Sequence, residues 1–141
     1  MDRRILIADD DAAVRRGAAE LLGGSGIEIV EAGDGEEALS VVRRTLAAGL
    51  GLHLALVDVH MPPPAEADAA ERTDGGIALF SLLRGQTPEL PLILWSGEAS
   101  EGVASWALAE GASAFLRKPV RPVHLRSEVQ RVLDIHWGAA G

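Results

Sequence analysis

The stretch Ile5-Leu-Ile-Ala-Asp9-Asp10-Asp11 is a short apolar run that ends abruptly in three carboxylates. A continuous apolar run of this length is typical of a strand that is buried on both faces of a sheet. Similar runs recur along the chain, separated by stretches with helical periodicity. We therefore predict strands at residues 4–8, 27–30, 53–59, 90–95 and 114–116.

Each predicted strand is followed by a helix-like segment. The apolar residues of these segments recur at intervals of three and four, which places them on one face of a helix. Glycines stand near the predicted helix ends, where left-handed backbone is often needed. Asp34 is predicted to cap the second helix. The predicted helices cover residues 11 or 12 to 22, 34–48, 75–84, 100–110 and 121–136.

This alternation of strands and helices predicts an α/β fold, a doubly wound five-stranded parallel sheet with helices on both faces. Ligands of such sheets bind beyond the carboxyl ends of the strands. The residues that follow the predicted strands are therefore candidates for a functional site. They are Asp9, Asp10, Asp11, Asp58, Ser96 and Lys118.

The composition of the 141-residue chain favours a single domain, and 48% apolar residues suffice for a core. The absence of cysteine excludes disulfides, thiolate metal sites and cysteine nucleophiles. A formal net charge of −8 argues against binding of nucleic acid or anionic membrane through the overall field. Because no apolar run has the length of a membrane span or a secretory signal, we expect a soluble, cytoplasmic, monomeric domain.

The clustered carboxylates predict a cation site. Two carboxylates about 5 Å apart repel by roughly 3 kcal/mol at an effective dielectric constant near 20. Several of them therefore need a proton or a bound cation, and oxygen ligands without thiolates favour Mg²⁺. Lys118, the only lysine of the chain, and Ser96 can contact phosphoryl oxygens. This set predicts a phosphoryl-transfer site with an aspartyl phosphate.

The order and spacing of the motifs resemble the receiver domain of two-component response regulators. The resemblance covers almost the entire chain and implies a flavodoxin-like sheet of order 2-1-3-4-5 with five helices. Five motifs carry it: residues 5–11, Leu54-Ala-Leu-Val-Asp58-Val-His-Met61-Pro62, Asp74-Gly75, Pro91-Leu-Ile-Leu-Trp95-Ser96-Gly97 and Gly111-Ala-Ser-Ala-Phe115-Leu-Arg-Lys118-Pro119.

The resemblance implies a chemical role for the residues at the strand ends. Asp58 would be the phosphoacceptor, and Lys118 would neutralise the phosphoryl group. Mg²⁺ would be held by Asp9, Asp10, Asp58 and the backbone carbonyl of His60.

Two further residues would form a switch. Ser96 takes the position of the hydroxyl residue that moves to the phosphoryl group, and Phe115 takes the position of the aromatic that turns inward with it. Phe115 is explained equally well as an ordinary core aromatic. The Lys118–Pro119 peptide bond would be cis.

The resemblance also implies partners and boundaries. A sensor histidine kinase or histidine phosphotransfer protein would donate the phosphoryl group, which would switch a protein-contact surface on the fourth helix, fifth strand and fifth helix. The chain would be a monomer or a phosphorylation-dependent dimer, would contact no nucleic acid or membrane directly, and would catalyse only its own phosphorylation and dephosphorylation. The domain would span residues 1–137 with a loop inserted at about 62–74, and residues 138–141 would form a tail.

Two other functions stay open on the sequence. A haloacid-dehalogenase-like phosphohydrolase begins with Asp-x-Asp, which Asp9 and Asp11 could provide. Ala13 stands where that motif has Thr or Val, and no acid pair follows Lys118. The other function is that of a pseudo-receiver, which would keep the fold as a docking module without being phosphorylated.

Several charged residues and one histidine are expected to have structural roles only. Asp11 is expected to cap the first helix. Arg15, Arg16 and Glu20 are expected on a solvated helix face, and His53 is expected to be structural.

Overall fold

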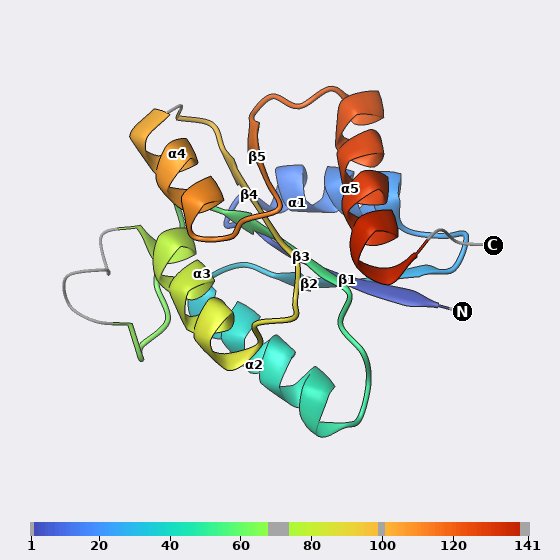
Figure 1. The fold of residues 1–141 in the computed structure, drawn as a ribbon, viewed down its shortest axis with the longest axis horizontal. Helices are drawn as coiled ribbons and strands as arrows, with labels where there is room; N and C mark the ends of the chain where they lie inside the picture. Colours follow the sequence, from blue (N-terminus) through green and yellow to red (C-terminus); the bar gives the residue numbers. More distant parts are fainter. Residues whose placement is uncertain (1, 68–73, 99–100, 139–141) are drawn as a thin grey trace.

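The computed structural model describes residues 2–67, 74–98 and 101–138, and a parallel sheet runs through its centre (Figure 1). The strand order is β2-β1-β3-β4-β5, and each neighbouring pair is parallel. The strands are β1 (Arg3–Ala8), β2 (Ile27–Ala32), β3 (Leu54–Asp58), β4 (Leu92–Ser96) and β5 (Ala114–Arg117).

Helices alternate with these strands throughout the described residues. The predicted fold class and the strand order 2-1-3-4-5 are therefore confirmed. The predicted ends differ by one or two residues, and the predicted start of the fourth helix at residue 100 lies outside the described residues. The helices are α1 (Ala12–Leu22), α2 (Gly35–Ala47), α3 (Gly75–Gln86), α4 (Glu101–Ala109) and α5 (Pro122–Trp137).

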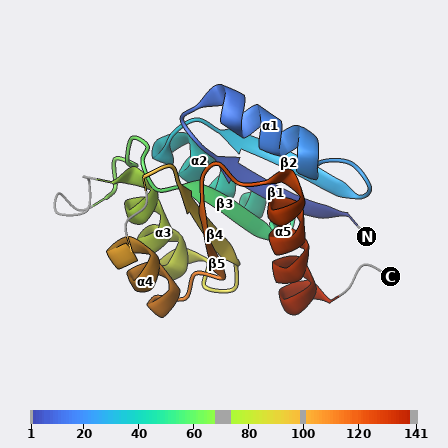
Figure 2. The ribbon, with the colours of Figure 1, turned by 90° about the horizontal axis from the view of Figure 1, so that it is seen from above.

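The sheet is covered by a helix layer on each face (Figures 1 and 2). On one face, α1 and α5 contribute Leu22 and Val129 to a buried cluster. On the other, α2, α3 and α4 contribute residues such as Leu39 and Phe80 to a second cluster. Every residue of β3 is buried because it is covered from both sides, which explains why its sequence is apolar up to Asp58.

Two aspartates start helices as predicted. The Asp11 carboxylate accepts hydrogen bonds from the backbone N–H groups of Ala13 at 3.0 Å and Val14 at 3.2 Å. The Asp34 carboxylate accepts from the N–H of Glu37 at 2.7 Å. Both side chains satisfy donors that a helix start leaves unpaired.

The start of α3 lies so close to the end of β3 that its first two positions have room only for glycine. A Cβ atom on Gly75 would overlap the carbonyl oxygen of Met61, and one on Gly76 would overlap the carbonyl oxygen of Asp58. The N–H of Gly76 donates to the carbonyl of Val59 at 3.0 Å. This close approach fixes the loop that follows Asp58.

The described beginning of the predicted insertion packs on α2. The N–H of Ala65 donates to the Glu36 carboxylate at 2.6 Å, and Arg43 forms an ion pair with Glu66. Its residues 68–73 lie outside the described residues. The loop is thus joined to α2 directly after it leaves the end of β3.

The end of α5 packs at the amino-terminal edge of the sheet, where the strands begin. The Arg3 guanidinium donates to the Gly138 carbonyl at 2.7 Å, and the Trp137 indole N–H donates to the His53 carbonyl at 2.7 Å. The His53 ring accepts the N–H of Arg4 at 3.0 Å through Nδ1 and meets the Trp137 ring edge-on. The start of β1 and the end of α5 both lie at this edge (Figures 1 and 2).

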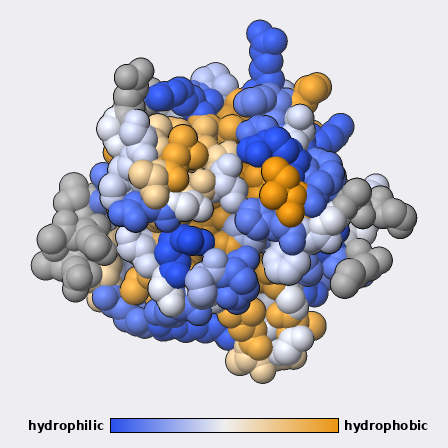
Figure 3. Space-filling view, viewed as in Figure 1, coloured by the Kyte–Doolittle hydropathy of each residue, from blue (hydrophilic) through white to orange (hydrophobic). Residues whose placement is uncertain are grey.

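On the face shown in Figure 3, hydrophobic side chains form separate patches between hydrophilic ones. Isolated exposed apolar residues of this kind are normal for a folded protein. Among the described residues, no helix has the length and apolar character needed to cross a membrane.

We predict that His53 makes stability fall in mild acid. Burial, followed by the charges of Arg3 and Arg4, lowers the pKa of His53 below its ordinary value. As the pH falls, His53 is therefore protonated in the unfolded chain before it is protonated in the folded protein. The stability that neutral His53 contributes is complete above about pH 6.5 and is lost as the pH falls through its folded pKa. Thermal unfolding at pH 7.5 and pH 5 should show a smaller loss for His53→Asn, whose Oδ1 keeps the acceptor, than for wild type. Equal losses would contradict this role.

We also predict that Gly76→Ala destabilises the fold and that Gly85→Ala in the same helix does not. The first methyl meets backbone at Asp58, whereas nothing lies within 4 Å of the second. Gly76→Ala should lower the free energy of unfolding by at least about 2 kcal/mol. Gly85→Ala should raise it by about 0.5–1 kcal/mol, as for a helix glycine without a special role. Denaturant titration measures both, and similar values for the two variants would refute the close approach.

Candidate functional site

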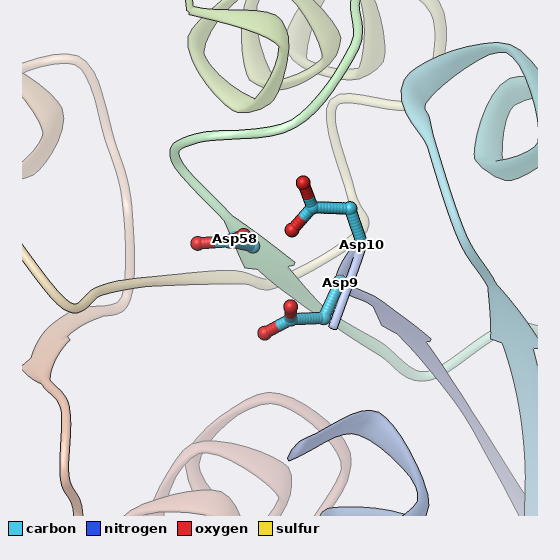
Figure 4. Close-up of side chains that lie close together, drawn as sticks. All are labelled: Asp9, Asp10 and Asp58. Atoms are coloured by element: carbon cyan, nitrogen blue, oxygen red, sulfur yellow. The ribbon is translucent and has the colours of Figure 1, made fainter. Parts of the chain in front are cut away.

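Three carboxylates meet at the carboxyl ends of β1 and β3 (Figure 4). Asp9 and Asp10 follow β1, and Asp58 is the last residue of β3. One carboxylate oxygen from each lies within 4.8 Å of the others. Asp9 and Asp58 are buried, whereas Asp10 is exposed. The predicted convergence of these residues is confirmed, because parallel neighbouring strands end side by side.

Lys118 supplies positive charge from the neighbouring end of β5. Its Nζ lies 2.5 Å from Oδ2 of Asp9 and 3.3 Å from Oδ1 of Asp58. The backbone holds it there, since the N–H of Lys118 donates to the Ser96 carbonyl at 2.8 Å. The following peptide bond, Lys118–Pro119, is cis as the resemblance implied.

Asp9 is held by more than Lys118. The N–H of Asp11 donates to Oδ1 of Asp9 at 2.9 Å. The Arg15 guanidinium donates to the Asp9 carbonyl at 2.6 Å and pairs with Glu31 at 3.0 Å. The prediction that Arg15 lies on a solvated helix face is therefore wrong, because its long side chain turns back over the start of α1 and is largely buried.

Asp58 is difficult to ionise. Burial, followed by the neighbouring Asp9 carboxylate, raises the pKa of the Asp58 carboxyl to about 6. The Lys118 ammonium and the His60 N–H, which donates at 3.4 Å, act in the opposite direction. The charged form of Asp58 is thus kept under electrostatic strain that a nearby cation would relieve.

The donor set suits a hard divalent cation. Three carboxylate oxygens from two adjacent strand ends match the ligand preference of Mg²⁺, which takes few protein carboxylates and keeps room for water and phosphoryl oxygens. The described residues fit such an ion through the chemistry of their donors and the repulsion it would remove.

Ser96 is the last residue of β4, and Phe115 is the second residue of β5. Ser96 is buried, and its hydroxyl donates to the Glu98 carbonyl at 2.7 Å while accepting the Glu98 N–H at 3.1 Å. Phe115 is half-buried, packs against the layer of α2, α3 and α4, and lies under the Arg117 guanidinium at 5.7 Å. Ser96 ends β4 opposite Arg117 of β5, and Phe115 lies two residues earlier in β5, opposite Leu94.

His60 makes contacts that sequence patterns did not reveal. Its Nδ1 lies 3.0 Å from Oδ1 of Asp74, and its Nε2 lies 4.0 Å from Oε2 of Glu98. Asp74 stands directly before α3, on the far side of the predicted insertion. The contact joins the loop that follows Asp58 to the start of α3.

A groove of about 910 Å³ borders the site on the side of α1 and α5. Val14 and Leu21 of α1 line it together with Leu125 of α5, and Trp95 and Lys118 lie in its wall. The Lys118 ammonium therefore faces both the carboxylates and an open, largely apolar surface.

The family model described as response regulator receiver domain matches residues 5–130. This match covers every strand-end residue of the site. It agrees with the resemblance that the sequence motifs carried.

Curated relatives match the chain as a part of longer proteins. The chain is 32% identical over 134 residues to the transcriptional activator protein ExaE of Pseudomonas putida, covering 94% of this chain and 56% of that protein. It is 35% identical over 121 residues to the transcriptional regulatory protein PdtaR of Mycobacterium tuberculosis, covering 83% and 50%. The chain thus spans about half the length of these relatives.

Solved structures show the same fold. The crystal structure of a CheY-like response regulator receiver domain protein from Methanospirillum hungatei matches with a TM-score of 0.80 at 27% sequence identity, covering 96% of this chain and 97% of that one. A flavodoxin-like receiver fold is therefore established for this chain.

We predict that removing the Asp58 charge stabilises the metal-free protein at neutral pH. The pKa of Asp58 is raised to about 6 in the folded protein from an ordinary value of 3.8. The stability that protonated Asp58 contributes is therefore fully present below pH 3.8 and is lost as the pH rises through 6. Asp58→Asn should raise the free energy of unfolding by about 1–3 kcal/mol at pH 7.5 in chelator, and much less at pH 4.5. Denaturant titrations at both pH values test this, and an equal gain at the two would contradict it.

Proposed function

Because this chain belongs to the response regulator receiver domain family, we propose that Asp58 accepts a phosphoryl group and that this modification is its signal. Receiver domains of this family act in two-component signalling. The observation that carries the proposal is the Lys118 ammonium, which lies between the buried carboxylates of Asp9 and Asp58. That geometry provides a nucleophile and a fixed positive charge for the same phosphoryl group.

We propose a phosphohistidine of a sensor histidine kinase or a histidine phosphotransfer protein as the donor, since histidine kinases phosphorylate receiver domains. A carboxylate oxygen of Asp58 attacks phosphorus and forms a P–O bond. The P–N bond to the donor imidazole breaks, its electron pair stays on that nitrogen, and the nitrogen takes a proton. Lys118, 3.3 Å from Oδ1 of Asp58, then pairs with the phosphoryl oxygens.

We assign the metal ligands to Asp9, Asp10, Asp58 and the backbone carbonyl of His60. Mg²⁺ bound there supplies positive charge that offsets the negative charge on the phosphoryl oxygens. The protein's own contribution is orientation: Asp9 is fixed by Lys118 and by the N–H of Asp11, so its carboxylate needs little reorganisation.

We assign the switch to Ser96 and Phe115. To bond the phosphoryl group, the Ser96 hydroxyl would exchange its 2.7 Å bond to the Glu98 carbonyl for a phosphoryl oxygen. Phe115, half-buried beside this strand end, would turn inward with it. The surface of α4, β5 and α5 would change as a result and would contact a protein target, as a monomer or in a phosphorylation-dependent dimer.

The haloacid-dehalogenase-like alternative has no support from the comparisons. It requires a free second aspartate in the first motif, yet the Asp11 carboxylate is bonded to the N–H groups of Ala13 and Val14 at the start of α1. We therefore propose that the chain catalyses only its own phosphorylation and dephosphorylation.

We also propose that residues 1–137 form one receiver unit interrupted by the insertion at about 62–74. The described elements run from Arg3 to Trp137, and they pack around one sheet. The relatives are about twice as long as this chain. In a longer protein that contains this unit, we propose that the output depends on the partner or domain that the unit contacts.

We predict that the purified chain, incubated with phosphoramidate and Mg²⁺, gains one phosphoryl group on Asp58, as measured by mass spectrometry of the intact protein and of its peptides. Asp58→Asn should abolish the gain. Lys118→Ala should slow it by about 100-fold, because a fixed donor at the developing charge is lost.

Asp11→Asn is the matched control for this experiment. Asparagine caps helices as well as aspartate does, so this variant should be phosphorylated like wild type. Absence of any gain in wild type would leave the pseudo-receiver as the remaining function, and a gain that survives in Asp58→Asn would place the acceptor elsewhere.

A further inference from the structure

Trp95 lies against the ammonium group of the site. It is the fourth residue of β4, 3% exposed, and it pairs in register with Asp58 of β3 and with Leu116 of β5. The Lys118 Nζ lies 4.8 Å from the centre of its ring. The indole face is therefore the third partner of an ammonium that also contacts two carboxylates.

We propose that Trp95 is a positioning residue that holds Lys118 over the phosphoacceptor by a cation–π contact, an inference that rests on the function proposed for Asp58. The contact is within the range in which an ammonium is attracted to the negative face of an aromatic ring. The attraction is stronger where water is excluded, and the Lys118 side chain is only 18% exposed.

The indole N–H gives a second, independent reason. Among the described residues, Nε1 of Trp95 is buried with no hydrogen-bond partner. A buried N–H without a partner destabilises a fold, and an aliphatic residue would fill a strand position between helix layers without that penalty. Trp95 is therefore poorly explained by packing alone, whereas the ring face has a clear use beneath Lys118.

The ring suits a lysine that has to change partners. The hydrogen bond to Asp9 is directional and the ion pair with Asp58 is short, so an ammonium that turns toward a phosphoryl oxygen must give up part of these contacts. A ring face attracts the ammonium over a range of positions and offers no competing hydrogen-bond acceptor. Trp95 thus keeps the charge at the site while its oxygen partners change.

The single lysine of the chain allows a direct test. In protein labelled with ¹³C-lysine, the εCH₂ group of Lys118 gives the only lysine signal, and the indole ring should shift its protons upfield in the wild type. Trp95→Leu should remove this ring-current shift, and Trp95→Phe should keep part of it. An εCH₂ signal that is unchanged in Trp95→Leu overturns the proposal, whether or not Asp58 can be phosphorylated.

Phosphorylation by phosphoramidate and Mg²⁺ tests the consequence. The rate constant for Asp58 should fall by about 5- to 30-fold in Trp95→Leu, the range expected for a partly desolvated cation–π contact, and by less in Trp95→Phe. Trp95→Leu also leaves a cavity where the buried indole packed, so its melting temperature should fall, and the rates are compared at a temperature at which both proteins are fully folded. Equal rates in the leucine variant and wild type, or a rate in Trp95→Phe no higher than in Trp95→Leu, would overturn the proposal.

Trp106→Leu is the matched control for a tryptophan removed elsewhere. Trp106 of α4 meets the Phe80 ring edge-on at 5.5 Å, away from Lys118. This variant should lower the melting temperature and leave both the Lys118 signal and the phosphorylation rate unchanged. Absence of phosphorylation in wild type, with the ring-current shift present, would count against the proposed function and not against the contact.

Discussion

Negative charge at the carboxyl edge of the sheet is tolerable in this protein because Lys118 is fixed between the carboxylates of Asp9 and Asp58. Without that ammonium, two buried carboxylates would face each other and a third at short range, with repulsion comparable to a large share of a domain's stability. Even with it, burial holds the pKa of Asp58 near 6. The metal-free site therefore stores unfavourable electrostatic free energy. A bound cation would lower this free energy directly.

The fold provides this arrangement through simple geometry. Parallel strands covered on both faces have to be apolar along their length, so charged residues collect where the strands end. Gly75 and Gly76 let α3 approach the end of β3 so closely that the loop after Asp58 has little freedom. Directly after this loop, the chain is joined to α2 by the Arg43–Glu66 pair. Asp58 is thus held by packing and backbone contacts, and the charges around it need little reorganisation.

Much of this was predictable from the sequence. The periodicity gave the five strand–helix units, and the strand ends gave Asp9, Asp58 and Lys118. The Asp11 cap followed from its place before a helix. The sequence could not reveal contacts made by long side chains that cross between elements. Arg15 turns back onto the Asp9 carbonyl, and His60 reaches Asp74 across the insertion. Local patterns specify which face a residue occupies, but they do not specify where a flexible side chain ends.

The two edges of the sheet differ in how well their polar groups are satisfied. At the amino-terminal edge, Arg3 and Trp137 donate to backbone carbonyls, the His53 ring accepts the N–H of Arg4, and these contacts hold α5 against the sheet. At the carboxyl edge, Asp58 is strained, and Trp95 has a buried N–H without a partner among the described residues. Function requires groups that are poorly satisfied until a ligand arrives. A small domain can accommodate them because the strain is confined to one edge while the opposite edge and both helix layers remain well packed.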